Sequence, residues 1–150
     1  MSQITDIKTL LILDEGCEPT IYKDTTGHWT GGIGHNFSIP MSDAAIDAIF
    51  QLDLIEAMKT CNALFPHFNS MDPVRRMVLI DMAFNLGYAK LSGFVNTIGF
   101  INDGNWEQAA RNMLASKWAT QVGIRATRLA RMMRTGEYPM DPRDPAAVNS

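Results

Sequence analysis

Apolar residues recur at helical spacing near the start of the chain. Their repeat over residues 3–14 predicts an amphipathic helix. The apolar positions of this face are Ile4, Ile7, Leu10 and Leu11. Gly16 can adopt the left-handed conformation that commonly ends a helix, so Glu15 is expected on the last turn.

A second and longer apolar repeat begins after Met41. It predicts a helix over about 42–62, with Ser42 as its N-terminal cap. The apolar positions are Ile46, Ile49, Phe50, Leu54, Ala57, Met58 and Cys61. At 1.5 Å per residue such a helix is about 30 Å long. That is long enough to connect an N-terminal lobe to the rest of the chain.

The second half of the chain is predicted to form a set of helices around an apolar one. Residues 74–85 are almost all apolar, which predicts the core helix of a second lobe ending at Gly87. Three more helices are predicted at residues 94–102, 106–116 and 124–135, separated by Asp103–Asn105 and Gln121–Gly123. The ten methionines are expected to fill the core. The proline-rich end, residues 139–150, is expected to be a mobile tail.

Between the first two helices lies a segment with two acids in different settings. Glu15 is followed by Asp24 in a turn sequence, then by Thr30 in a strand-like stretch that closes in Gly31–His35. Residues 18–35 therefore predict a hairpin or a three-stranded sheet. The unsatisfied carbonyls of a helix end and partial burial should help Glu15 to keep its proton. Donors in the turn should keep Asp24 ionised, as acid–base hydrolysis requires of a carboxyl pair.

The spacing of these residues resembles the signature of the phage-type lysozymes, the T-even phage endolysin family. The signature is Glu15, eight intervening residues, Asp24, then Thr30 and Gly32–His35. Later matches follow in family order at Arg75–Arg76, Met82–Gly87, Gly93–Phe94, Trp106, Ser116–Trp118, Arg125 and Arg134–Gly136. The resemblance covers residues 3 to about 137.

The resemblance implies an α+β, mostly helical fold in a single lysozyme domain, residues 1–150. Its parts would be a small lobe with a sheet at about 1–45, a connecting helix at about 42–62, a helical lobe at about 63–137 and a mobile tail at 138–150. The implied reaction is hydrolysis of the β-1,4 bond between N-acetylmuramic acid and N-acetylglucosamine in peptidoglycan. Glu15 would be the general acid, and Asp24 and Thr30 would position and activate water, with inversion at the anomeric carbon. No metal or organic cofactor is implied.

The resemblance also implies which residues line the substrate cleft. They are Gly34, His35, Phe84, Asn85, Asn112, Trp118 and Arg125. In the family the arginine pairs with the catalytic glutamate, which implies a contact between Arg125 and Glu15. Without the resemblance, we would expect Phe84 and Trp118 to be core residues and Arg125 to be a solvated charge.

The distribution of charge leaves a second interpretation open. Residues 1–64 carry three basic and nine acidic side chains, a net charge of −6, whereas residues 65–150 carry ten and seven, a net of +3. Residues 111–134 contain six basic residues and no acid. Such a lobe suits a polyanionic chain, and it is also the footprint of a nucleic-acid-binding protein. Two further hypotheses are a lytic transglycosylase, which needs no aspartate–threonine pair, and a catalytically inactive peptidoglycan-binding module.

Cysteine usage and hydropathy restrict the function further. Cys17 and Cys61 are too few for a disulfide framework and suit no metal site, so both are expected as free thiols. The N-terminus lacks the basic region of a signal peptide, and Asp6 and Asp14 interrupt its apolar run. The expectation is a monomer that binds no nucleic acid and does not insert stably into a membrane. It would stay in the host cytoplasm until lysis and reach the wall through a separate holin-like pore.

Overall fold

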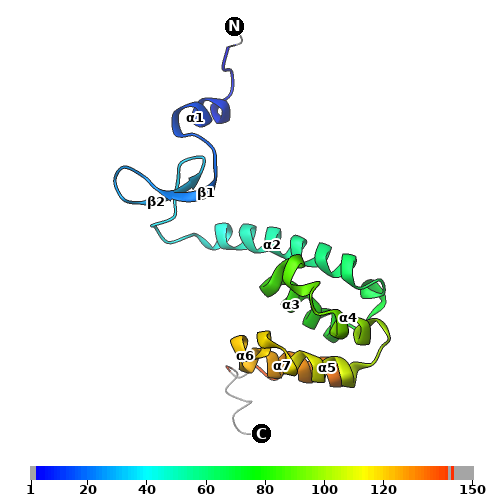
Figure 1. The fold of residues 1–150 in the computed structure, drawn as a ribbon. Helices are drawn as coiled ribbons and strands as arrows, with labels where there is room; N and C mark the ends of the chain where they lie inside the picture. The colour runs from blue at the N-terminus through cyan, green and yellow to red at the C-terminus, as the bar shows by residue number, and fades with distance from the viewer. Residues whose placement is uncertain (1–2, 142, 144–150) are drawn as a thin grey trace. The chain divides into compact units, whose positions relative to one another are not determined.

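The computed structural model describes residues 3–141 and 143, and the chain divides into two compact units, residues 1–49 and 50–150. The described part is mostly helical, with one three-stranded antiparallel sheet in the first unit (Figure 1). This confirms the predicted α+β fold with a small sheet-bearing N-terminal part.

The first helix, α1 (Ile7–Glu15), begins four residues after the predicted start. Asp6 sets that start because its side chain accepts a hydrogen bond from the Thr9 amide at 2.8 Å, satisfying one of the free donors of the first turn. At the other end Gly16 has a φ of +78°, and its amide donates to the Ile12 carbonyl. Glu15 is therefore the last helical residue, as the sequence predicts.

The sheet consists of β1 (Glu18–Lys23), β2 (Trp29–Gly32) and β3 (His35–Asn36), with β2 in the centre. Thr30 pairs with Tyr22 on one side and Asn36 on the other, so it occupies the middle of the central strand. Its side chain is buried, unlike most of this unit. The sheet thereby holds the hydroxyl of Thr30 in a fixed position.

The long helix α2 (Asp43–Leu64) begins in the first unit and ends in the second. A 3₁₀ turn, η1 (Phe68–Ser70), then leads to α3 (Pro73–Leu91). The predicted helix end at Gly87 is confirmed, because two helical segments meet there in a kink within α3. Gly87 has a non-helical conformation (φ +71°, ψ 173°), but helical structure resumes after it and continues to the end of α3.

Four more helices follow α3: α4 (Val95–Asn102), α5 (Trp106–Ala115), α6 (Lys117–Val122) and α7 (Ile124–Thr135). Three of them match the predicted segments. Helix α6 corrects the prediction that Gln121–Gly123 is only a connection. At six residues it is too short to show an apolar period, and it is defined by its ends: the Ser116 hydroxyl accepts from the Ala119 amide at 3.2 Å, and Gly123 has a φ of +58°.

The core of the second unit is built around α3. Helix α7 packs against α3, α5 and α6, and α5 also packs against α4 (Figure 1). The fully buried side chains include methionines from three helices: Met82, Met113 and Met133. The expectation that methionines fill the core is confirmed for these residues, each contributing roughly 1.5–3 kcal/mol through burial.

Arg75 joins three helices of this unit. Its Nε donates to the Met133 carbonyl at 2.7 Å and its Nη2 to the Arg134 carbonyl at 3.1 Å, near the end of α7. Its Nη1 donates to the Asp72 carboxylate, and the guanidinium lies 4.5 Å from the ring centre of Trp106 on α5. A planar group with several donors is needed for this set of contacts, which lysine does not provide.

Neither a membrane span nor a metal cluster is found among the described residues. No described helix is both long enough and apolar enough to cross a bilayer. The described histidines, cysteines and acids include no group of three that could hold a metal ion. The prediction of a mobile tail falls mainly on residues 142 and 144–150, which lie outside the described part.

The two cysteines are free thiols in different environments, which gives a direct test of the fold. Cys17 is exposed, whereas Cys61 lies in the core, where burial raises the pKa of its thiol to about 12. A thiol reagent at neutral pH should therefore label Cys17 alone, and Cys61 only after denaturation. In a Cys17→Ser variant, labelling of the folded protein should disappear; rapid labelling of that variant would contradict the burial of Cys61.

Candidate active site

The carboxyl group of Glu15 lies against the backbone of the turn between β2 and β3. A Cβ atom added to Gly34 would lie 2.8 Å from Glu15 Oε2 and 3.0 Å from its Cδ. Gly34 also has a φ of +65°, which side chains other than glycine rarely adopt. The glycine thus leaves the space that the carboxyl group occupies. Glu15 is exposed and α1 buries none of its residues, so the first unit does not supply the partial burial that was expected.

Asp24 is held by hydrogen bonds from its own turn. Its Oδ1 atom accepts from the Thr26 amide and the Thr26 hydroxyl, both at 2.8 Å, and from the His28 amide at 2.9 Å. Three donors exceed the two lone pairs of one carboxylate oxygen, so Oδ1 has no accepting capacity left. One oxygen of Asp24 therefore serves to fix the carboxylate in the turn.

The second oxygen of Asp24 faces Thr30. The Thr30 hydroxyl lies 3.4 Å from Asp24 Oδ2 and 3.2 Å from the His28 carbonyl, and it can donate its single proton to only one of them at a time. Oδ2 therefore keeps accepting capacity, next to a hydroxyl held by the central strand. A carboxylate oxygen and a hydroxyl side by side form a site that can hold a water molecule and take its proton.

The same hydrogen bonds determine the ionisation of Asp24. The His28 amide, followed by the Thr26 hydroxyl and amide, lowers the pKa of this carboxyl below its ordinary value of 3.8. Each of these bonds stabilises the charged form. Asp24 is therefore ionised at neutral pH, as the turn sequence predicts.

Two residues of this network were not predicted from the sequence. Thr26 donates to Asp24 and also lies 2.7 Å from His28 Nδ1, so the three side chains form one chain of polar contacts. The available signal was the turn itself, because an aspartate that begins a turn commonly accepts bonds from the residues two to four positions later. From the sequence, those donors could be assigned only to the turn in general.

The predicted residue His35 lies on the short edge strand β3, paired with Gly31. Its ring meets the edge of Phe37, with ring centres 4.7 Å apart. His35 and Gly34 therefore belong to the same unit as Glu15, Asp24 and Thr30. Their contact with a substrate stays a prediction.

In the second unit, Asn85 and Trp118 come together. The Trp118 indole Nε1 donates to Asn85 Oδ1 at 2.8 Å, and its ring packs edge-on against Phe94 with centres 6.2 Å apart. Trp118 is almost fully buried, as expected of a core residue, and its indole also makes this polar contact. The hydrogen bond connects α3 to α6.

Beside Trp118 lies a groove of about 530 Å³. Asn112, another predicted residue, lines it together with Lys90, Lys117 and Phe94. This groove offers aromatic surface, an amide and two ammonium groups, which suit hydroxyl, amide and carboxylate groups of a ligand. The two lysines were not predicted, because in the sequence each is indistinguishable from an ordinary surface charge.

Phe84 is exposed and lies near Phe50, with ring centres 6.1 Å apart. Both line a second hollow of about 410 Å³, which also contains Arg125. Arg125 donates from Nε to Asp81 Oδ1 at 2.8 Å, an ion pair that was not predicted from the sequence. Asp81 is the single acid in α3, but the sequence does not show which basic residue it pairs with. The predicted pairing of Arg125 with Glu15 stays a prediction.

The basic run over residues 111–134 is partly neutralised by local pairs. Arg111 contacts Glu107, Arg125 contacts Asp81, and Arg131 contacts Glu137. The last pair is longer, at 3.5 Å. Three of the six basic residues thus have an acidic partner outside the run. This lowers the positive field that a nucleic-acid-binding surface would need.

The Asp24 network predicts the effect of removing one hydroxyl. Thr26→Val should raise the pKa of Asp24 towards 3.8, because one bond to the charged form is lost. A lowered folded pKa adds stability above the ordinary value, and this gain disappears as the pH falls through the folded pKa. The cost of Thr26→Val should therefore be larger at pH 7 than at pH 2–3. Carbon-13 titration of the carboxyl and melting at both pH values would measure this.

Thr25→Val is the matched control, since it removes a neighbouring hydroxyl that makes no hydrogen bond to Asp24 in the described structure. It should leave the titration of Asp24 unchanged. If Thr26→Val and Thr25→Val gave the same titration curve, the assignment of the network would be wrong.

Comparison with known proteins identifies the family. The phage lysozyme family model matches residues 13–135. The chain is 29% and 27% identical to probable T4-type lysozymes 1 and 2 of Dictyostelium discoideum, over 89% of this chain and 96% of each relative. It is also 26% identical to the pre-baseplate central spike protein Gp5 of Enterobacteria phage T4, over 91% of this chain and 29% of that protein. The chain belongs to the phage lysozyme family and is a lysozyme-like glycoside hydrolase.

Proposed function

We propose that this protein hydrolyses the β-1,4 bond between N-acetylmuramic acid and N-acetylglucosamine in peptidoglycan. Glu15 gives a proton to the glycosidic oxygen as the bond to the anomeric carbon breaks. A water molecule forms the new bond to that carbon, and Asp24 takes the proton that the water loses. The products are two shorter glycans, one with a new reducing end, and the anomeric configuration is inverted.

The observation that supports this mechanism best is the unequal use of the two oxygens of Asp24. Oδ1 accepts three hydrogen bonds from the turn, and Oδ2 faces the Thr30 hydroxyl at 3.4 Å. The first set holds the carboxylate still and charged, and the second leaves an oxygen free to act as base. Thr30 is buried in the central strand, so its hydroxyl is a rigid second contact for the water.

Gly34 has a matching role for Glu15. Because no side chain occupies that position, the carboxyl group can lie against the backbone of the β2–β3 turn. Glu15 then has fewer accessible positions than a free glutamate at a helix end. A general acid held in one place accelerates the reaction more than an equally strong acid that moves freely.

The second unit would supply substrate contacts. In the groove beside Trp118, the half-buried ring of Phe94 suits the apolar face of a sugar ring, and Asn112 suits an N-acetyl or hydroxyl group. Lys90 and Lys117 suit the carboxylates that muramic acid and its peptides carry. We assign this groove to the glycan, with Phe84 and Asn85 as further contacts.

In the cell we propose an endolysin: a monomer made in the host cytoplasm that acts on the wall at lysis, after a separate holin-like pore has opened. The support is the likeness to phage-type lysozymes over most of the chain. The likeness to a baseplate spike protein is the observation that favours a second setting, in which such a domain is part of a phage tail. Lysis of host cells from within, on expression with a pore-forming partner, would distinguish the two.

Analysis of the cleavage products tests the proposed reaction. Purified peptidoglycan should be cut to fragments that end in reducing sugars, and Glu15→Gln should reduce the rate by about 10²–10⁴-fold because the proton donor is lost. Mass spectrometry identifies the ends, and circular dichroism shows whether the variant is folded. Fragments with only 1,6-anhydromuramic ends would instead indicate a lytic transglycosylase. Binding without any cleavage would indicate an inactive module.

The contact between Gly34 and Glu15 gives a second test. Gly34→Ala should displace the Glu15 carboxyl group, since the new Cβ would lie 2.8 Å from Oε2. We expect kcat to fall at least tenfold, together with a loss of about 1 kcal/mol of stability from the left-handed backbone. Steady-state kinetics and thermal melting would measure the two effects separately.

Gly32→Ala is the control for backbone strain. Gly32 has a φ of +59°, close to that of Gly34, but a Cβ there would meet nothing within 4 Å. It should therefore cost similar stability with a much smaller loss of kcat. If both variants lost the same activity, the close approach of Glu15 to Gly34 would not matter for catalysis.

A further inference from the structure

The ring of His28 completes the hydrogen-bonded turn that holds Asp24, and the mechanism above gives this ring no role. Its Nδ1 atom lies 2.7 Å from the Thr26 hydroxyl oxygen, which in turn lies 2.8 Å from Asp24 Oδ1. The same Nδ1 atom lies 4.0 Å from Asp24 Oδ2, the oxygen that we assign as the base. One ring nitrogen therefore borders both the support of the carboxylate and its reactive oxygen.

The single proton of the Thr26 hydroxyl fixes the direction of this chain of contacts. An ionised carboxylate can only accept, so the contact with Asp24 Oδ1 is a hydrogen bond only when Thr26 donates to it. Thr26 then has no proton left for His28, and its oxygen can only accept from the ring. Both contacts are satisfied together in one arrangement, in which His28 Nδ1 carries a proton and donates a hydrogen bond to Thr26.

The other neutral form of the ring opposes this arrangement. If only Nε2 carries the proton, Nδ1 is an acceptor. It then either competes with Asp24 for the Thr26 proton or faces an oxygen lone pair at 2.7 Å. The hydrogen bonds of a histidine ring decide which of its nitrogens is protonated. The geometry therefore selects a proton on Nδ1, in the neutral ring as well as in the charged one.

The ring of His28 faces the Asp24 carboxylate and, among the described ion pairs and hydrogen bonds, no other charged side chain. On the adjoining strands, the nearby titratable groups make different contacts. The Lys23 ammonium on β1 lies 5.2 Å from the ring centre of Trp29, and the ring of His35 on β3 packs against another aromatic ring. A proton gained by His28 therefore acts mainly on Asp24.

We propose that His28 is a positioning residue for the hydrolysis: by donating from Nδ1 to Thr26, it directs the Thr26 proton to Asp24 and so holds Oδ2 in place to take a proton from water. This inference rests on the proposed function. The ring touches neither the water nor the sugar and acts through Thr26. The backbone amide of His28 makes a separate hydrogen bond to Asp24 Oδ1, which every side-chain variant keeps.

Two replacements of His28 test whether a donor is needed at this position. Asparagine can present an N–H close to the position of Nδ1, whereas leucine cannot. His28→Leu should lower kcat by about three- to fivefold, the effect of one exposed hydrogen bond, whereas His28→Asn should stay within about 1.5-fold of the parent. Steady-state kinetics on purified peptidoglycan would measure this, and circular dichroism melts would show that both variants are folded.

The pH profile gives a readout that a purely structural role would not move. The acid limb of kcat/KM reports protonation of the base, Asp24. The His28 amide and the Thr26 hydroxyl lower the pKa of Asp24, and the charge of the His28 ring adds to this effect. His28→Leu should therefore move the acid limb to higher pH, while the alkaline limb, which reports Glu15, stays in place. His28→Asn should give an intermediate limb, since it keeps the donor but not the charge.

Nitrogen-15 NMR of the histidine rings tests the geometry without any substrate. At a pH high enough for the rings to be neutral, the His28 signals should show the proton on Nδ1. Thr26→Val should shift the ring towards the Nε2 form, because the acceptor is lost. The His28 signals are identified by their absence in His28→Leu. A proton found on Nε2 alone in the parent protein would overturn the proposal.

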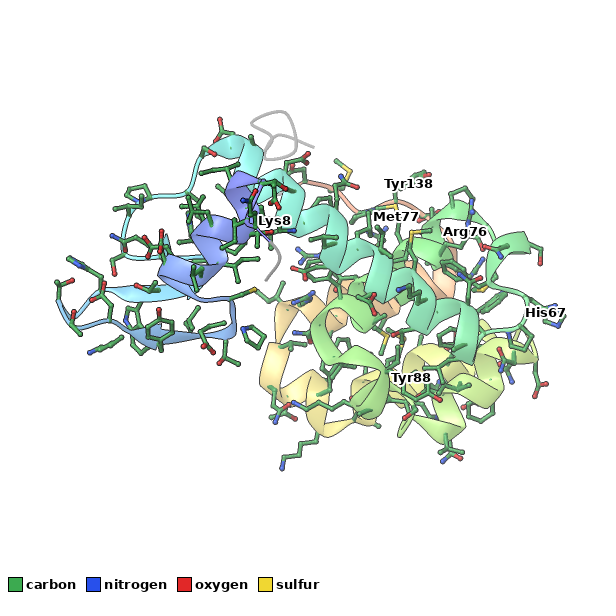
Figure 2. The ribbon with its side chains drawn as sticks, turned by 90° about the horizontal axis from the view of Figure 1, so that it is seen from above. Lys8, His67, Arg76, Met77, Tyr88 and Tyr138 are labelled. Atoms are coloured by element: carbon green, nitrogen blue, oxygen red, sulfur yellow. The ribbon has the colours of Figure 1, made fainter. Side chains whose placement is uncertain are left out.

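His67→Leu is the matched control. His67 is exposed, lies between α2 and α3 (Figure 2) and makes no side-chain hydrogen bond within the described part of the chain. It should leave both kcat and the acid limb at the parental values. An unmoved acid limb in His28→Leu, or an equal loss of kcat in His28→Leu and His28→Asn, would contradict the positioning role. Failure of the parent protein to cleave peptidoglycan would count against the proposed function itself, and the nitrogen spectra would still decide the direction of the hydrogen bond.

Discussion

The packing of the apolar face of helix α3 is the constraint on which the second unit depends. One face carries Val78, Leu79 and Met82 into the core at 1% exposure or less. Because these side chains leave little freedom to rotate or shift the helix, the residues on its other faces are also fixed. Two polar residues among them make contacts to later helices: Asp81 binds Arg125, and Asn85 binds Trp118. The packing of an apolar core thus positions the polar contacts of α6 and α7 that the candidate site uses.

The first unit is organised by a different kind of interaction. Between residues 3 and 49 the buried side chain of note is Thr30, and α1 buries none of its residues. Its local geometry comes from hydrogen bonds: those of Asp6 at the start of α1, those of the Asp24 turn and those of the sheet. Such bonds give about 0.5–1.5 kcal/mol each, but they are directional. They suit a site in which two carboxyl groups need fixed positions and different protonation states.

The sequence predicted what depends on period and spacing. For the helices with a clear apolar repeat, such as α2 and α3, most of the predicted ends lie within a few residues of the observed ones. The six-residue helix α6 was not, because its length is below two turns and only its caps define it. For the site, spacing identified Asp24 and Thr30, but the roles of Thr26 and Asp81 depend on which atoms meet. A threonine in a turn and an acid in a helix have too many possible partners for spacing to decide.

The ion pair between Arg125 and Asp81 bears on the remaining prediction for Arg125. Its Nε and Nη2 atoms already face Asp81, at 2.8 Å from Oδ1 and 3.4 Å from the carbonyl oxygen. A two-pronged contact with any other carboxylate would therefore use Nη1 together with Nη2, or would displace Asp81. Since Asp81 is held in place by the packing of helix α3, displacing the arginine leaves a carboxylate without its cation. If Arg125 pairs with Glu15, the Glu15 carboxylate must therefore either displace Asp81 from these N–H donors or share the guanidinium with it.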